Sequence, residues 1–120
     1  MGLDCYVYKA KLQNVIDDET VSDTSKHCKF QKLTLEEVHY WRKNYVLHNF
    51  FERIYREKFG DEEEFNCKLI RIRPVDIDNL KLMIFNRYDD IDTLREYVDF
   101  FKKAKKQLKD GFALFYEGWY

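Results

Sequence analysis

The sequence has few glycines, prolines and cysteines, the residue types on which many enzyme motifs depend. Four glycines and one proline occur in 120 residues, and the glycines form neither a dinucleotide-binding motif nor a P-loop. Cys5, Cys28 and Cys67 are odd in number and contain no CxxC pair, so we expect reduced thiols in a cytoplasm and no zinc. No apolar run approaches the ~20 residues that span a bilayer, which predicts no membrane association.

The sequence also lacks an excess of charge of either sign. The 21 basic and 22 acidic residues leave a formal net charge of −1, so the chain lacks the basic field that typifies nucleic-acid binding. Aromatic residues, in contrast, make up 18% of the chain. Such a surplus of rings predicts that some face a partner or ligand, because Tyr and Trp are favoured in binding surfaces. The length suits one domain over residues 1–120.

The longest helical pattern runs from Thr34 to Phe59. Thr34 followed by Glu37 has the spacing of a capping box, and no Gly or Pro interrupts the segment before Gly60. Within the apolar face of this expected helix, Glu37, Asn44 and His48 lie on one line with Trp41 between them. Buried polar groups need hydrogen-bond partners, so the line is either a satisfied core network or the wall of a cleft.

Three shorter segments read as strands, because apolar side chains alternate along them: Leu3–Leu12, Cys67–Arg73 and Phe112–Glu117. Two further helices are expected, one capped by Asp76 and ending near Phe85, and one from Ile91 to Lys109. The polar segment 17–26 is expected to be a loop. The order is then β-α-β-α-α-β. This order predicts an α+β fold, with a three-stranded antiparallel sheet covered by a long central helix and two others.

Several short sequences occur together in a recognisable order. The chain opens MGLDCYVYK, carries YWRK at Tyr40–Lys43 followed by His48, contains the Asn66–Cys67 pair, and closes FYEGWY. In this combination it resembles a family of uncharacterised small phage and prophage proteins, which open MGLDMYLYK, carry YWRKANxIHxW and close with a strand like YYQSSW. The resemblance implies a phage or prophage source and no particular reaction.

The family pattern is kept at Tyr40–Lys43 and His48 and altered elsewhere. Asn44 stands where the family usually has alanine, and Tyr45 where it usually has asparagine. Phe50 replaces a usual tryptophan. If the family's Trp, Asn and His form a polar site, this chain has changed it.

No catalytic set has a discriminating spacing. Cys5 or Cys67 with His48 could form a nucleophile pair only if the fold brought them together, and we expect no cofactor. We therefore predict an accessory protein, without catalytic activity, that binds a host or viral macromolecule and inhibits a host defence or host enzyme. The partner is expected to be a protein and not nucleic acid. The predicted binding residues are Trp41, Arg42, Asn44, His48, Glu37, Tyr6 and Tyr8.

The alternative prediction is a protein that binds, or an enzyme that acts on, a small molecule or nucleotide-like ligand at a site around His48. An open concavity beside His48 would favour this alternative, and a filled interior would disfavour it. The sequence leaves the partner, the ligand and the oligomeric state open.

Overall fold

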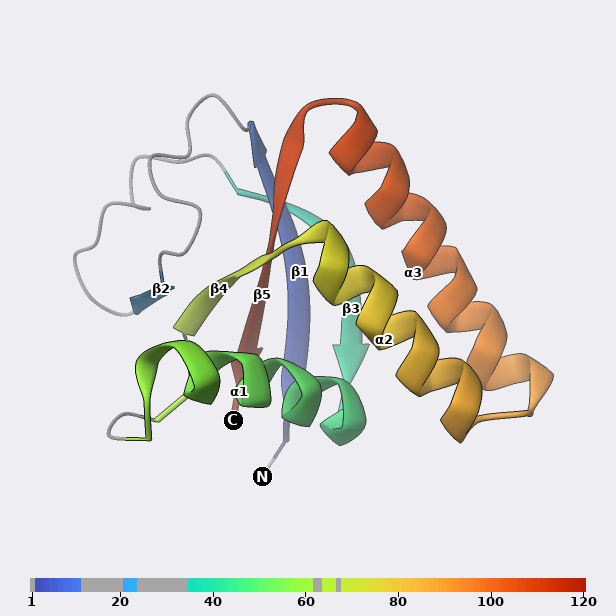
Figure 1. The fold of residues 1–120 in the computed structure, drawn as a ribbon, viewed down its shortest axis with the longest axis horizontal. Coiled ribbons are helices and arrows are strands. Elements are labelled where there is room, and N and C mark those ends of the chain that lie inside the picture. Colours follow the sequence, from blue (N-terminus) through green and yellow to red (C-terminus); the bar gives the residue numbers. More distant parts are fainter. Residues whose placement is uncertain (1, 12–20, 24–34, 62–63, 67) are drawn as a thin grey trace.

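The computed structural model describes residues 2–11, 21–23, 35–61, 64–66 and 68–120. Its strands form one sheet in the order β2-β4-β5-β1-β3, and every neighbouring pair is antiparallel (Figure 1). Along the chain the elements are β1 (Asp4–Lys11), β2 (Val21–Asp23), β3 (Glu36–Arg42), α1 (Tyr45–Phe59), β4 (Lys68–Ile72), α2 (Pro74–Arg87), α3 (Ile91–Lys109) and β5 (Phe112–Trp119).

The predicted α+β class, the antiparallel sheet and the three helices are confirmed. The predicted strands became β1, β4 and β5, which lie side by side with β5 in the middle. The strand number and the element order were wrong, because the described residues hold two further strands. The strand β2 falls within segment 17–26, which was expected to be a loop, and pairs with β4. The rest of that segment lies outside the described residues.

The largest correction concerns the predicted helix Thr34–Phe59. Residues 36–42 form β3, and helix α1 begins only at Tyr45. Val38 and the aromatic residues after it, Tyr40 and Trp41, suit the pleated, half-buried surface of a strand. The partner strand is β1. Between β3 and α1, Lys43 takes a left-handed backbone with φ 57°, which turns the chain sharply. Thr34 lies outside the described residues.

Each helix starts at a local signal. In α1 the Asn44 side chain accepts from the Leu47 N–H at 3.1 Å, and in α3 Asp90 accepts from the Thr93 N–H at 3.0 Å. Asp76, the predicted cap of α2, lies instead inside its first turn. The helix begins with a proline, and the Asp76 carboxylate accepts from the Arg73 N–H at 2.8 Å.

All three described helices pack on one face of the sheet. The helices α2 and α3 form an antiparallel pair, and α1 crosses the end of the sheet near both chain termini (Figure 1). The main core lies between the helices and the sheet: Phe51 of α1 stacks on Tyr116 of β5 with ring centroids 4.4 Å apart, and Leu80 and Phe100 are fully buried members of the same cluster. On the opposite face, a smaller buried cluster contains Leu69, Ala113 and Phe115.

Candidate functional site

The sheet divides the predicted binding residues into two groups. Side chains alternate along β1, so Cys5 joins the helix-covered core while Tyr6 points to the opposite face. Trp41, Asn44 and His48 lie on the helix-covered side, whereas Tyr6, Tyr8, Glu37 and Arg42 lie on the side that no described helix covers. The predicted polar line through Glu37, Asn44 and His48 is therefore wrong, because β3 turns Glu37 away from the other two.

His48 is built into the interior. It projects from α1 and is 6% exposed, and its Nδ1 lies 2.7 Å from the Tyr116 hydroxyl of β5. Burial lowers the pKa of His48 and raises that of Tyr116. Both groups are therefore neutral near pH 7, and the hydroxyl can donate to Nδ1 of a neutral imidazole. The rings of Phe65 and Tyr120 complete the surroundings, each with its centroid 5.1 Å from the imidazole.

The space beside His48 is filled by backbone. A Cβ placed on Gly118 would overlap Nδ1 and Cε1 of the imidazole and press on the Tyr116 hydroxyl. Cys5 lies nearby, where its Sγ is 3.7 Å from the Asn44 carbonyl oxygen, and burial raises the pKa of its thiol. A buried, protonated thiol is a poor nucleophile, so the arrangement does not resemble an activated Cys–His pair.

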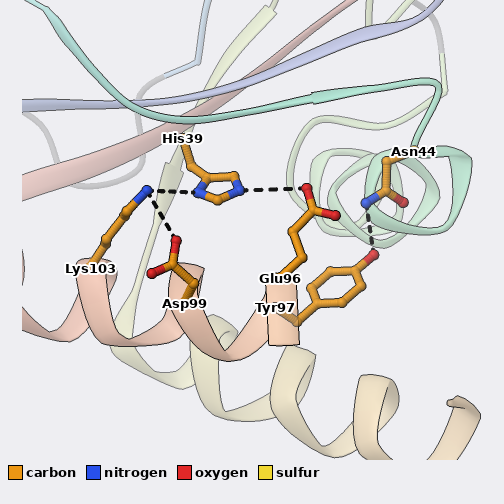
Figure 2. A network of polar contacts seen from close by, with 6 residues as sticks. All are labelled: His39, Asn44, Glu96, Tyr97, Asp99 and Lys103. Carbon is orange, nitrogen blue, oxygen red and sulfur yellow. Dashed lines mark hydrogen bonds and ion pairs between the residues drawn. The ribbon is translucent and has the colours of Figure 1, made fainter. Parts of the chain in front are cut away.

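Asn44 links α1 to α3. Its Nδ2 donates to the Tyr97 hydroxyl at 2.7 Å (Figure 2). Its Oδ1 accepts from the Leu47 N–H and caps α1. Trp41 is 5% exposed and packs edge-on against Phe100, with ring centroids 4.9 Å apart. Its indole Nε1 is buried without a hydrogen-bond partner among the described residues. Asn44 and His48 are thus each hydrogen-bonded to a core tyrosine, Tyr97 and Tyr116, which favours the core alternative over the wall of a cleft.

The other group forms a partly exposed patch together with Tyr40, which was not among the predicted binding residues. Tyr6 stacks on Tyr8 with centroids 5.6 Å apart, and Tyr40 of β3 lies 5.1 Å from Tyr6. The Tyr40 hydroxyl donates to Asp4 at 2.5 Å, a bond that raises the pKa of Tyr40 to about 12. Tyr40 lies within the predicted helix Thr34–Phe59, but the structure places it on β3, where it is 40% exposed.

Charged residues lie at the borders of these rings. Glu37 lies opposite Tyr8 in the β1–β3 pair, and Arg42 lies opposite Asp4; both Glu37 and Arg42 are exposed. We call the following set the tyrosine patch: Tyr6, Tyr8, Glu37, Tyr40 and Arg42.

A buried carboxylate adjoins the tyrosine patch. Glu117 of β5 lies opposite Tyr6 and is 3% exposed. Its Oε1 accepts from the Trp119 indole, whereas its Oε2 has no hydrogen-bond partner in the described part of the chain. Burial and then the charge of Glu117 raise the pKa of Tyr8. The sequence placed Glu117 at the end of a strand and offered no sign of this proximity.

A network of charged side chains that the sequence did not predict lies along α3. His39 of β3 accepts at Nδ1 from the Lys103 ammonium at 3.4 Å, and its Nε2 faces the Glu96 carboxylate at 3.8 Å (Figure 2). Lys103 also pairs with Asp99 at 3.2 Å. Burial and Lys103 lower the pKa of His39, while Glu96 and Asp99 oppose the shift. This network joins the edge strand β3 to α3.

The described residues line two clefts in the helical layer. One of about 190 Å³ lies between α1 and α2, and one of about 280 Å³ lies between α2 and α3; His48 lines neither. In the part of the chain that the structure describes, no three His, Cys, Asp or Glu side chains gather as a metal site requires. Cys5 is a free thiol, and Cys28 and Cys67 lie outside that part.

The comparisons with known proteins leave the site to be judged by its own chemistry. The chain matches no protein-family model, no curated protein and no solved structure. Among the described helices, none is long and apolar enough to cross a membrane.

Proposed function

We propose that the protein acts by binding another macromolecule, a protein of a host or virus, through the tyrosine patch. The observation that carries this proposal is the row of Tyr6, Tyr8 and Tyr40 on the sheet face that no described helix covers. Tyrosine and arginine are enriched among the residues that dominate binding energy, and Arg42 stands exposed beside the row. A sheet holds such side chains rigidly, which lowers the entropy lost on binding.

The surroundings of His48 favour this proposal over a ligand site or enzyme. The imidazole is 6% exposed, and rings and the Gly118 backbone fill the space around it. A ligand would have to displace packed side chains to reach it. The resemblance to phage and prophage proteins supports a role against a host defence or host enzyme, as the use to which such binding is put.

Affinity capture from a bacterial lysate, followed by mass spectrometry, tests the proposal. The wild-type protein should retain a specific partner, and a variant carrying Tyr40→Ala and Arg42→Ala should lose it. The matched control carries Tyr45→Ala and Arg95→Ala, which remove the same exposed side-chain types from α1 and α3. Equal capture by the patch variant and the control, with both proteins folded, would reject the tyrosine patch as the binding surface.

A further inference from the structure

A cleft of about 280 Å³ between α2 and α3 combines cations with an apolar floor. We call it the lysine cleft; its lining residues are Lys81, Phe85, Val98, Phe101, Lys102 and Lys105. The two rings differ in exposure: Phe101 is 4% exposed and forms part of the core, whereas Phe85 is 48% exposed. No carboxylate is among the lining residues.

The charge pairing of these lysines differs from that of their neighbours on α3. Lys103 pairs with Asp99 at 3.2 Å and Lys106 with Asp110 at 3.5 Å. Within the described residues, Lys81, Lys102 and Lys105 have no carboxylate within ion-pair distance. The Lys81 ammonium instead lies over the Phe101 ring, 5.6 Å from its centroid. The cations at the cleft are thus available to an anionic occupant.

Size and charge together select the kind of occupant. A cleft of about 280 Å³ lies below the range typical of pockets for drug-sized ligands, yet it can receive one large apolar side chain. A nucleic acid gains affinity by neutralising many phosphates in a row, whereas the cleft offers three cations around an apolar floor. A protein segment with an apolar anchor between carboxylates satisfies both features.

We propose that the lysine cleft binds an acidic segment of a partner protein, with an apolar side chain against Phe85 and Phe101 and carboxylates facing the lysines. Laying the apolar side of a segment between two helices is a common mode of peptide recognition. The lysine cleft lies in the helical layer, whereas the tyrosine patch lies on the opposite face of the sheet. The two surfaces can therefore be tested separately.

The probe is a synthetic fluorescein-labelled peptide in which a Leu-Phe pair is flanked by Glu on both sides, and binding is followed by fluorescence anisotropy. The wild-type protein should bind it, more weakly as salt rises. Lys102→Gln with Lys105→Gln should weaken binding about five- to tenfold, the change expected for losing two exposed ion pairs. Lys106→Gln with Lys109→Gln changes the net charge equally on the same helix and should leave binding nearly unaltered.

Three outcomes would overturn the proposal. The first is no binding of the Glu peptide by the wild-type protein. The second is equal weakening in both lysine variants, which would indicate general charge attraction. The third is tighter binding of an oligothymidine single strand, which would assign the cleft to nucleic acid. Tyr40→Ala should leave peptide binding intact, so the result is independent of the tyrosine patch.

Discussion

His39 and His48 lie on the same side of the sheet, and burial lowers the pKa of both, yet the two side chains have different structural roles. The His48 ring lies among aromatic rings and is bonded to a single hydroxyl. The His39 ring packs on Trp41, with centroids 4.1 Å apart, but its two nitrogens face charged side chains of α3. One imidazole is a packing element, and the other is part of an electrostatic contact between two elements.

The difference shows that burial alone does not identify a histidine's role. The side chain of His39 is 9% exposed, close to the 6% of the whole His48 residue. What separates them is the charge around the ring. Among the described residues, Glu52 is the charged side chain that acts on the pKa of His48, whereas Lys103, Glu96 and Asp99 act on that of His39. Substitutions should therefore affect mainly stability at His48 and mainly proton affinity at His39.

The largest effect is expected from His48→Ala. This variant removes the ring contacts with Phe65, Tyr116 and Tyr120 and takes the imidazole acceptor away from the buried Tyr116 hydroxyl. The free energy of unfolding, measured by chemical denaturation, should fall by about 3 kcal/mol. Tyr116→Phe, which removes the hydroxyl and keeps the ring, should cost less, about 1–2 kcal/mol.

A binding measurement on the His48→Ala protein completes the test of a structural role for His48. At a temperature where the His48→Ala protein is folded, it should still retain the partner captured through the tyrosine patch. Unchanged stability together with lost binding would contradict the structural role of His48. That result would move the candidate site to the alternative around His48.

A smaller effect should appear in the pH dependence of stability. Because burial lowers the folded-state pKa of His48 below the ordinary value of 6.5, the unfolded chain binds more protons in the window between the two values. The contribution is complete above about pH 6.5 and is lost as the pH falls toward the folded pKa, with a slope of at most about 1.4 kcal/mol per pH unit.

Denaturation of the wild-type and His48→Gln proteins between pH 8 and 5 measures this contribution. The wild-type protein should lose more stability on acidification, because glutamine does not titrate. Parallel curves for the two proteins would show that His48 takes up its proton equally well in the folded and unfolded states.

The parts of the fold that the sequence predicted correctly are those whose signals are local. Alternating apolar residues located β1, β4 and β5, and α3 has the predicted bounds, Ile91 and Lys109, with Asp90 as its cap. The prediction of a helix over residues 36–42 was wrong because this segment combines a helical spacing of apolar residues with residue types that suit a strand. Pairing with β1 decided between them, and that pairing joins distant parts of the chain.

The prediction of one polar line through Glu37, Asn44 and His48 was wrong for the same reason. Placing Glu37 and His48 on one helix put them on one side, whereas the strand and the turn at Lys43 separate them. Tyr6 and Tyr8 were predicted binding residues, and the structure places them beside each other, with Tyr40 next to Tyr6. The contact between His39 and Lys103 spans 64 positions of sequence, and nothing local to either residue indicates it.

The smallest expected effect is a pair of opposite pKa changes at His39. Lys103 lowers the pKa of His39 and Glu96 raises it, so Lys103→Met should raise this pKa and Glu96→Gln should lower it further. Each substitution should change the free energy of unfolding by no more than about 0.5 kcal/mol, because both partners are about half exposed. Titration of the imidazole proton resonances by NMR measures the two pKa values. The His48 resonance serves as the internal control, since neither Lys103 nor Glu96 acts on its pKa. Shifts of His39 in one direction for both variants would show that the contacts in Figure 2 do not control its charge.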